Sequence, residues 1–404
     1  MSGADFMERL LNGVAVKWMP LGEVGNFIRG NGMQKKDFVQ DGFPAIHYGQ
    51  LYTRYGLVAD KTFTYVPEAL AGRLKKARKN DLLLATTSEN DEDVVKPLAW
   101  LGGDVAISGD MMLFRHDQNV QYLAYFFQTS EFQEQKRKYI TGAKVRRLSS
   151  GDLAKILTPI PCPDNPQKSL EIQAEIVRIL STFTELTTEL TTELTTELTT
   201  RKKQYNHYRD QLLSFEEGEV EWKTLGDLAD NLDFMRKPIT SGLRDPGDIP
   251  YYGASGIVDY VKDYIFDGDF LLVSEDGANL LARNTPIAFS ISGKSWVNNH
   301  AHVLKFETYA ERKYVEYYLN SIDLTPYISG AAQPKLNKRN LEDIRIPNPS
   351  PGEKKRIVDM LDKFDALTNS ISEGLPREIE LRQKQYAYYR DLLLGFPKPE
   401  EVAA

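Results

Sequence analysis

The sequence predicts an α+β fold with a pseudo-two-fold internal repeat, in which two globular domains are joined by two long antiparallel helices. The segment from Ile176 to Phe215 returns in register, 181 positions later, between Ile357 and Phe396. The segment Val16–Glu23 returns, 204 positions later, as Val220–Asp227. Self-similarity at this scale indicates duplicated structural units, so the order along the chain is globule, helix, globule, helix.

The length of 404 residues agrees with two globules of ordinary domain size plus connecting helices. From the repeats we place four segments. They are a first globule with its opening segment (1–158), a central helical segment (159–215), a second globule (216–345) and a C-terminal helical segment (346–404).

The central helix is expected to begin at Ser169, as its cap, and to end near Phe215, because four prolines precede it and neither Pro nor Gly interrupts it. Within it, the block T-E-L-T is written four times from Thr184 to Thr199. Threonine-rich helices have low intrinsic stability, and the glutamates repel one another at a spacing of four residues. The helix therefore needs a partner.

The expected partner is the duplicated helix, which should start after Pro351-Gly352, break near Gly374–Pro376 and resume to Phe396. Antiparallel packing would bring the basic residues of this helix within reach of the glutamate row. The contact stripe is expected to consist of the tract leucines, although a four-residue step drifts about 40° per repeat around an α-helix. The basic residues are Arg377, Arg382 and Lys384, and the leucines are Leu186, Leu190, Leu194 and Leu198.

Both globules combine buried strands with aromatic helices. Asp81–Ala85 and Asp269–Val273 are apolar runs followed by polar loops, as expected of core strands. Tyr122–Phe127 and Tyr314–Leu319 are expected to be helices whose rings lie in the core rather than form a platform for stacked bases.

Composition excludes several classes of protein. A single cysteine, Cys162, rules out a disulfide framework or a cysteine-rich zinc site. No signal peptide or apolar run of membrane-spanning length is recognisable, so we expect a soluble, cytoplasmic protein without a membrane partner. The net charge of −7 argues mildly against nucleic acid, but local charge points the other way.

Basic residues gather in matching loops of the two halves. The segment Lys136–Arg147 contains six basic residues and no acid, and its loop Gly142–Ser149 aligns with Gly330–Asn337 of the second half, which is also basic. An ordinary solvated surface is the alternative interpretation. Polar and aromatic side chains near Tyr48 and Tyr251 are of the kinds that read base edges, although plain strand and turn elements are equally consistent with them. The candidate DNA-binding residues are Gln50, Tyr52, Arg54, Lys144, Arg146, Arg147, Tyr252, Ser255, Gln333, Lys335, Lys338 and Arg339.

The sequence lacks a convincing catalytic or cofactor motif. Asn165-Pro166-Gln167 and Asn348-Pro349-Ser350 lack the second proline and the aromatic residue of an adenine methyltransferase motif. Ala288–Ser295 fits only a relaxed Walker pattern, and no helix is expected after it to bind phosphate. Asn299–His302 offers two histidines without a cysteine or a nearby carboxylate pair, which is a weak metal site. We therefore expect no catalytic residue, cofactor or metal on this chain.

Taken together, the residues resemble the specificity (S) subunits of type I restriction-modification systems, and the IC subclass in particular. The resemblance covers essentially the whole chain and is carried by Ile160–Pro166, the T-E-L-T tract, Arg201–Phe215 and Gly374–Tyr386, with further likeness at Tyr251–Ile257 and Val297–Val303.

The resemblance implies a non-catalytic reader with two target recognition domains, each binding one half of a bipartite double-stranded DNA target. It implies two modification subunits on the conserved helices, which carry S-adenosylmethionine and methylate adenine N6. Restriction subunits, joined through the modification subunits, would use ATP and Mg²⁺.

Two alternatives from other classes remain. A self-contained DNA methyltransferase is disfavoured by the missing motifs and would be favoured if the isolated chain bound S-adenosylmethionine. A coiled-coil scaffold that does not bind DNA is disfavoured by two dissimilar globules on duplicated stems. The sequence does not indicate which bases are read or the length of the gap between the two half-sites.

Overall fold

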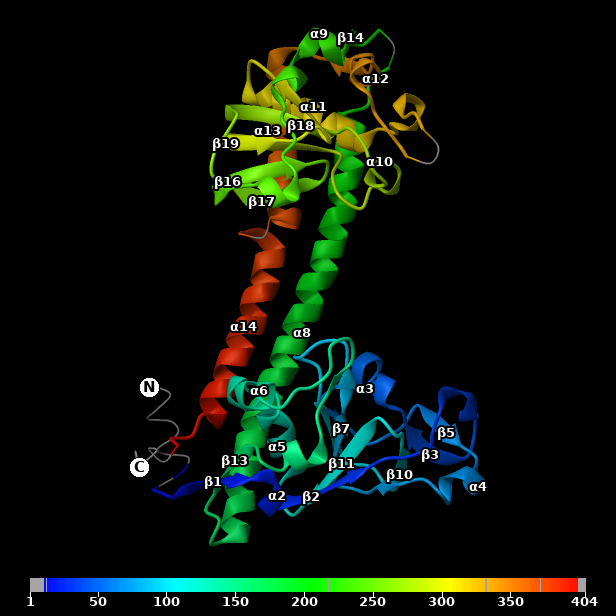
Figure 1. The fold of residues 1–404 in the computed structure, drawn as a ribbon, viewed down its shortest axis with the longest axis vertical. Helices are drawn as coiled ribbons and strands as arrows, with labels where there is room; N and C mark the ends of the chain where they lie inside the picture. Colours follow the sequence, from blue (N-terminus) through cyan, green and yellow to red (C-terminus); the bar gives the residue numbers. More distant parts are fainter. Residues whose placement is uncertain (1–10, 12, 217, 331–332, 371, 399–404) are drawn as a thin grey trace. The chain divides into compact units, whose positions relative to one another are not determined.

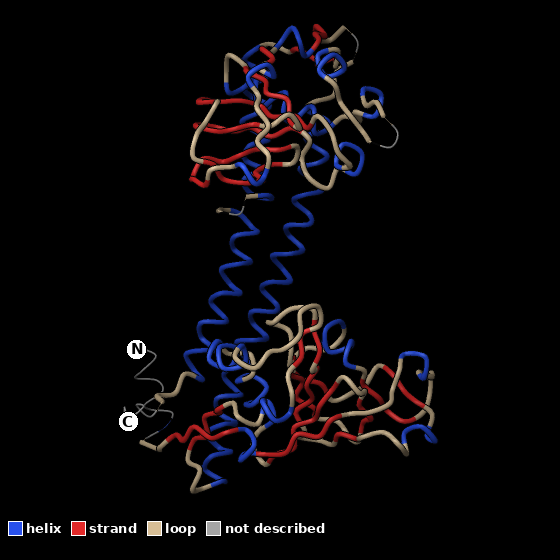
Figure 2. Tube along the Cα trace, viewed as in Figure 1, coloured by secondary structure: helices blue, strands red, loops and turns tan. Residues whose placement is uncertain are grey.

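The computed structural model describes residues 11, 13–216, 218–330, 333–370 and 372–398, and the chain divides into two compact units (Figure 1). The first unit comprises residues 1–192 together with 380–404, and the second comprises residues 193–379. Each unit combines mixed sheets with helices, as the predicted α+β class requires (Figure 2). None of the helices described has the length and apolarity needed to cross a membrane.

The first unit contains a five-stranded sheet in the order β2-β11-β7-β9-β4 and a four-stranded sheet in the order β5-β3-β10-β6. Strand β7 is buried along its whole length, as predicted for an apolar run. Its strands are β1 (Val16–Pro20), β2 (Gly25–Arg29), β3 (Phe43–Ile46), β4 (Val58–Ala59), β5 (Thr64–Val66), β6 (Lys76–Ala77), β7 (Leu82–Ala85), β8 (Thr87–Ser88), β9 (Lys96–Trp100), β10 (Val105–Ile107), β11 (Met111–His116), β12 (Arg146–Arg147) and β13 (Leu157–Pro161). Its short helices are α2 (Leu21–Val24), η1 (Lys35–Asp37), α3 (Tyr48–Thr53), α4 (Glu68–Ala71), α5 (Val120–Phe126), α6 (Ser130–Arg137) and α7 (Ser150–Leu153).

The second unit is built on one six-stranded sheet in the order β15-β20-β18-β19-β16-β17. Strand β18 lies between β19 and β20 and carries the buried run that the sequence predicts. The strands are β14 (Glu221–Thr224), β15 (Asp230–Asn231), β16 (Pro246–Gly253), β17 (Gly256–Val261), β18 (Phe266–Ser274), β19 (Ala288–Val297), β20 (Ala301–Lys305) and β21 (Arg345–Asn348). The helices are α9 (Leu225–Leu228), η2 (Asp233–Met235), η3 (Ser241–Leu243), α10 (Asn279–Ala282), α11 (Tyr309–Ser321), η4 (Thr325–Tyr327), α12 (Lys338–Glu342) and α13 (Pro351–Asn369).

The duplicated opening segments occupy equivalent places. In the first unit β1 pairs with β13, and Trp18 lies opposite Pro159. In the second unit β14 pairs with β21, and Trp222 lies opposite Pro347. Each opening strand is thus paired antiparallel with the strand that precedes a long helix, which confirms the internal repeat.

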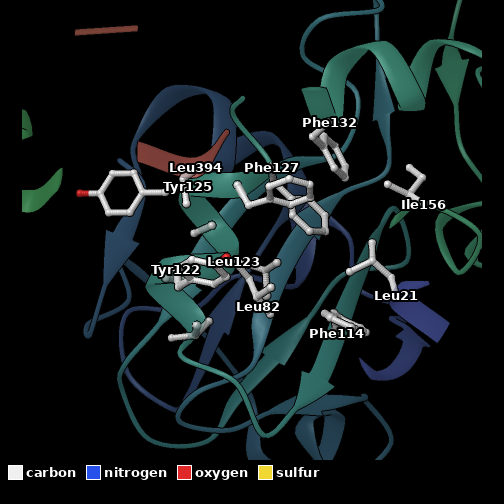
Figure 3. Packing of buried hydrophobic residues seen from close by; sticks show 14 of the residues in the cluster. Leu21, Leu82, Phe114, Tyr122, Leu123, Tyr125, Phe127, Phe132, Ile156 and Leu394 are labelled. Carbon is white, nitrogen blue, oxygen red and sulfur yellow. The ribbon is translucent and has the colours of Figure 1, made fainter. Parts of the chain in front are cut away.

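The core of the first unit joins its sheet to the long helices. Tyr122, Phe126 and Phe127 of the α5 region are fully buried, and Figure 3 shows the ring of Phe127 next to Leu394, near the end of the C-terminal helix. Ile176 and Leu180 contribute the face of the central helix. The aromatic helix is therefore part of the core, as predicted. The central and C-terminal helices, together called the stem, pack directly into the globule.

The second unit repeats this arrangement with the roles of the stem helices exchanged. Tyr314 and Leu319 of α11 are fully buried, and Ile357 and Leu361 of α13 take the places that Ile176 and Leu180 hold in the first unit. Leu213, at the end of the central helix, is the counterpart of Leu394. Burial of these repeated apolar side chains explains why this pattern recurs at a fixed offset.

The central helix, α8, spans Pro166–Leu212 and is capped by Asn165, so its cap was predicted four residues too late. Pro166 is accepted in the first turn, where its missing N–H has no intrahelical partner to lose. The Asn165 side chain accepts a hydrogen bond from the backbone N–H of Lys168 and acts as the cap. Ser169 is instead buried within the helix and accepts a hydrogen bond from Gln173.

The T-E-L-T tract is helical throughout. Its threonine hydroxyls donate to the carbonyl four residues earlier, as Thr191 does to Thr187 at 2.6 Å and Thr199 to Thr195 at 2.9 Å. These bonds satisfy hydroxyl groups that would otherwise compete with the helix. Leu186 is 58% exposed, so it does not belong to the predicted contact stripe. A step of four residues drifts around the helix, and this leucine has turned away from the packed face.

The C-terminal helical segment consists of α13 and α14 (Gly374–Leu394). Pro351 is the first residue of α13, and Ser350 caps it by accepting from the N–H of Glu353. The break lies earlier than predicted, between Asn369 and Gly374, and Pro376 sits in the first turn of α14, where proline is tolerated. Lys384 pairs with Glu380 of its own helix at 2.5 Å.

Candidate nucleic-acid interface

Two equivalent hairpins carry the basic residues singled out in the sequence. In the first unit, the backbone groups of Thr141 and Arg147 exchange hydrogen bonds of 3.0 and 2.9 Å. In the second unit, Ser329 and Lys335 do the same with two bonds of 2.8 Å. These four residues lie at the 188-residue offset expected from the sequence, so the predicted correspondence of the loops is confirmed at their closing pairs. Residues 331–332 of the second loop lie outside the described residues.

The second residue of each hairpin has to be glycine. Gly142 has φ +94° and Gly330 has φ +84°, both in the region that other residues avoid. A Cβ on Gly142 would lie 2.1 Å from the carbonyl oxygen of Val145, and one on Gly330 would lie 2.5 Å from that of Gln333. The tight turn therefore follows from two glycines that occur at matching positions.

Each hairpin is attached to the loop after the central buried strand of its sheet. In the first unit, β12 pairs with β8, with Arg147 opposite Thr87. In the second unit, Lys335 forms a bridge with Asp276, and the N–H of Leu336 donates to the carbonyl of Glu275 at 2.8 Å. The hairpins are thus held by the rigid centre of each sheet, which is a suitable base for a recognition loop.

The basic side chains of the first unit fall into two groups. Lys144 and Arg147 are exposed, and neither forms an ion pair with any described residue. Arg146 is held by Asp91, with 2.7 Å between its Nε and the carboxylate. Lys136, counted with this basic run in the sequence, is only 1% exposed and donates to the carbonyls of Glu92 and Val94. Burial lowers the pKa of Lys136 to about 8, and its role is structural.

The second unit presents a similar set. Lys335 reaches Glu275 with its Nζ 3.1 Å from the carboxylate, while half of its side chain stays exposed. Lys338 and Arg339 open α12, and the nearest acids lie at 3.6 and 3.9 Å. The Arg339 side chain is 90% exposed, so its ion pair with Asp343 contributes little to stability. Gln333 is exposed on the hairpin itself.

Tyr52 lies beside the first hairpin. Several polar side chains of this region, however, form hydrogen bonds with other groups of the protein. Gln50 is buried in α3, and its amide oxygen accepts from the backbone N–H of His47 and from Thr64. The Tyr52 hydroxyl donates to the Thr87 carbonyl at 2.8 Å, and burial raises its pKa. Tyr52 and Val145 of the hairpin line one cavity of about 370 Å³. Arg54 is exposed, with its guanidinium 6.0 Å from the ring centre of Phe63.

The turn between β16 and β17 holds the remaining two candidates. Ser255 is exposed at this turn, and the carbonyl of its neighbour Ala254 accepts a hydrogen bond from Ser274. Tyr252 is half-buried against Phe289, and burial raises the pKa of its hydroxyl. Ser274 is the chain neighbour of Glu275, whose carboxylate binds Lys335. The turn is therefore connected to the Lys335 hairpin through these two residues. In the first unit, the corresponding strand β3 is followed by helix α3 and not by a turn and a second strand. The two segments are therefore equivalent only in strands β3 and β16.

A buried ionic cluster in the second unit was missed by sequence reasoning. Asp233, Glu275 and His302 place possible ligand atoms within 4.8 Å of one another, so His302 does have the nearby carboxylate pair that seemed absent. The two ring nitrogens of His302 face the carboxylate of Asp233 at 2.6 Å and the carbonyl of Leu336 at 2.7 Å. Arg236 binds Glu275 at 2.6 Å.

This cluster is better suited to ion pairing than to metal binding. Burial by itself raises the pKa of Asp233 and of Glu275, but the hydrogen bonds and the charge attraction from His302, Arg236 and their other partners together outweigh it and hold both pKa values below the ordinary range. The cations Arg236 and Lys335 already occupy the carboxylates, and both nitrogens of His302 are engaged. Its members are far apart in sequence, so no local pattern could reveal them.

The relaxed Walker segment is not a phosphate loop. Ala288–Ser295 lies within β19, paired along its length with β18. Phosphate binding at such a motif needs backbone N–H groups at the start of a helix, and here those groups belong to a sheet. The expectation that no helix begins after this segment is therefore confirmed.

Each unit also has a cleft where its globule meets a stem helix. In the first unit, a cleft of about 590 Å³ is lined by residues of the α5–α6 region and by Tyr386 and Arg390 of α14. In the second unit, a cleft of about 480 Å³ is lined by residues of the α11 region and by Tyr205 and Arg209 of α8. The stem residues correspond at the 181-residue offset, so the clefts are equivalent.

Comparison with known proteins identifies the family to which this two-part fold belongs. A family model described as "Type I restriction modification DNA specificity domain" matches residues 14–200 and 217–381, one copy for each half. The chain belongs to this family of non-catalytic specificity subunits. It is 36% identical to the EcoR124I/EcoR124II specificity subunit of Escherichia coli, with both chains covered completely. It is 34% identical to the EcoprrI specificity subunit of Escherichia coli, over 92% of this chain and 93% of the relative.

Solved structures show the same fold. A chain from a structure described as the basis of complex assembly and conformational transition of the type I R-M system aligns with a TM-score of 0.60 and 14% identity, over 94% of this chain and 97% of that one. The HsdS subunit from Thermoanaerobacter tengcongensis aligns with a TM-score of 0.50 and 15% identity, over 94% and 96% of the chains. These alignments confirm the predicted α+β fold, and the family model and the curated relatives confirm the predicted membership of the specificity-subunit family.

Proposed function

We propose that this chain reads a bipartite double-stranded DNA target for a type I restriction-modification complex. Residues 1–158 and 216–345 act as target recognition domains, and residues 159–215 and 346–404 form the stems. The observation that carries the proposal is the pair of equivalent glycine-turn hairpins, each fixed to the centre of its sheet and each ending in a cation, Arg147 or Lys335. Membership of the IC subclass and action in the cytoplasm are part of the proposal.

The candidate residues divide by exposure into DNA-contacting and positioning groups. Exposed cations neutralise phosphates, and exposed polar groups reach base edges. We assign direct contact to Arg54, Lys144, Arg147, Ser255, Gln333, Lys335, Lys338 and Arg339. Gln50, Tyr52, Arg146 and Tyr252 are half-buried or engaged with protein groups, and in this proposal they position the others.

Two modification subunits occupy the two equivalent clefts beside the stems. The internal repeat supports this number, because a second copy of one surface binds a second copy of one partner. In this proposal the modification subunits supply S-adenosylmethionine for methylation of adenine N6. Restriction subunits, bound through them, supply ATP- and Mg²⁺-dependent cleavage. This chain contributes no catalytic group and binds no cofactor of its own.

The test uses Arg147→Ala and Lys335→Ala in the assembled methyltransferase, with binding to its target measured across a salt series. Loss of one phosphate contact should weaken binding and reduce the slope of log K against log salt by about 1. Arg147→Ala should have the larger effect, because the charge of Lys335 is already partly neutralised by its ion pair with Glu275. Lys355→Ala, an exposed lysine on α13, is the control. Unchanged affinity for both hairpin variants would remove the hairpins from the interface.

The enzymatic alternative has its own measurement. Calorimetric titration of the isolated chain with S-adenosylmethionine should show no binding, whereas a micromolar site on this subunit would favour a self-contained methyltransferase.

A further inference from the structure

Phe234 is the most exposed large apolar side chain among the described residues, with 80% of its surface accessible. Isolated exposed apolar residues are common and by themselves mean little. Phe234 differs because the turn that carries it, η2, is anchored on both sides. Asp233 accepts from the backbone N–H of Val303 at 3.0 Å, and Arg236 donates to the carbonyl of Ala301 at 2.8 Å. A ring that gains nothing from burial is therefore held on a rigid support.

Two separate chains of contacts tie this turn to the Lys335 hairpin. In the first, Arg236 and Lys335 bind the two oxygens of one carboxylate, that of Glu275, at 2.6 and 3.1 Å. In the second, His302 bridges the carboxylate of Asp233 and the carbonyl of Leu336. Residues on both sides of Phe234 thus contact the same groups as Lys335 and its neighbour. The turn that carries the ring and the hairpin that carries the cation are therefore held by one network of contacts.

Charge and apolarity have different roles on a surface that binds DNA. A lysine bound to phosphate fixes the position of the protein but carries no sequence information. An apolar side chain can contact the thymine methyl group in the major groove or insert between two base pairs, and both depend on sequence. A phenylalanine on an anchored turn, connected to a lysine that is proposed to bind phosphate, is suited to this role.

We propose that Phe234 is a base-contacting, specificity-determining residue of the second recognition domain. This inference rests on the proposed function, because it assumes that the Lys335 hairpin faces DNA. The ionic cluster of Asp233, Arg236, Glu275 and His302 is the support that holds Phe234 and Lys335 in register. The first unit has glycine at the position equivalent by the 204-residue offset, Gly30, so this contact belongs to one half-site only.

The experiment compares Phe234→Ala, Lys335→Ala and wild-type chains in the assembled methyltransferase, using selection from a DNA library randomised in both half-sites. Phe234→Ala should lose at least about tenfold in preference at one or two adjacent positions of a single half-site. The other half-site and the salt slope should stay unchanged, because no charge is removed. Phe234→Leu should retain part of the preference. The thermal midpoint of Phe234→Ala should equal that of the wild type, since the ring is not buried.

Tyr264→Ala removes another exposed ring of the same unit, outside this cluster, and is the matched control. Equal effects of both substitutions, or unchanged selectivity of Phe234→Ala in both half-sites, would overturn the inference. A changed number of bound modification subunits with unchanged selectivity would also overturn it, since the ring would then face protein. A Lys335→Ala effect beside a silent Phe234→Ala refutes this inference alone, whereas a wild-type assembly without preference for any bipartite sequence refutes the proposed function as well.

Discussion

The ring of Phe183 on α8 stacks on the ring of Tyr389 on α14, with centroids 5.5 Å apart and an angle of 15° between the planes. The same pair recurs in the second unit with the helices exchanged, where Tyr208 of α8 stacks on Phe364 of α13 at 5.7 Å and 28°. Phe183 and Phe364, like Tyr208 and Tyr389, are separated by the 181-residue offset. The repeat is therefore a repeat of contacts as well as of sequence.

Equivalent stems predict equivalent docking sites. A tryptophan placed in the first cleft (Arg137→Trp) or in the second (Thr285→Trp) should obstruct one site and leave the other, because both residues are exposed lining positions. Native mass spectrometry of the assembled methyltransferase should then show one modification subunit in place of two, and none for the double variant. Lys61→Trp, at an exposed position outside both clefts, should leave the number at two. Two bound subunits in the double variant would contradict the assignment.

The T-E-L-T tract should set the distance between the two half-sites. Deleting one tetrad shortens α8 by about 6 Å and adds a rotation of about 40° beyond a full turn. Since DNA rises about 3.4 Å per base pair, the unspecified gap should shorten by one to two base pairs, and the family resemblance favours one. Both half-site sequences should stay the same.

Methylome mapping of the deletion variant measures the gap directly. Deleting two residues is the control, because it turns everything downstream by about 200° and should abolish activity. An active tetrad-deletion variant with an unchanged gap would show that the tract is only a spacer.

Recognition should be modular. Replacing residues 25–158 with the matching region of a relative should change one half of the recognised sequence, because the exchange leaves the second sheet and its hairpin untouched. Sequencing of methylated sites in a host that carries the chimeric system reads both halves. A change in both halves would argue against independent recognition domains.

The stability of the first unit should depend on pH through His116. This side chain is buried at the end of β11, its Nδ1 accepts from the N–H of Gln118 at 3.1 Å, and its Nε2 has no hydrogen-bond partner among the described residues. Burial lowers the pKa of His116 to about 4. Between pH 6.5 and 4 the unfolded chain therefore binds a proton that the folded chain does not, and the free energy of unfolding falls as pH falls.

The loss should reach about 2 kcal/mol at pH 5 relative to pH 7.5. Urea unfolding across this range measures it, and His116→Asn, which keeps an acceptor for Gln118, should flatten the dependence. His207→Asn removes an exposed histidine and should follow the wild type. Parallel pH profiles for wild type and His116→Asn would exclude His116 as the titrating group.

The sequence by itself determined the duplicated architecture, the buried strands β7 and β18, the aromatic core helices and the matching basic hairpins. Each depends on local pattern or on a repeat, since apolar periodicity, turn glycines and a constant offset are visible without coordinates. Helix ends were placed less well. The cap of α8 is the residue whose side chain accepts from the first backbone N–H groups of the helix. Asn165 does so, whereas Ser169 is buried within the helix.

Only the tertiary structure decided which polar residues are available to a ligand. Lys136 and Gln50 look like surface residues in sequence, yet folding places them where backbone groups need their charge or their amide. The cluster of Asp233, Arg236, Glu275 and His302 joins three segments that are distant in the chain, so its ion pairs exist only after the sheet has formed. Exposure and long-range pairing are properties of the packed chain, and it is these that separate Phe234 and Arg147 from the many residues of similar type.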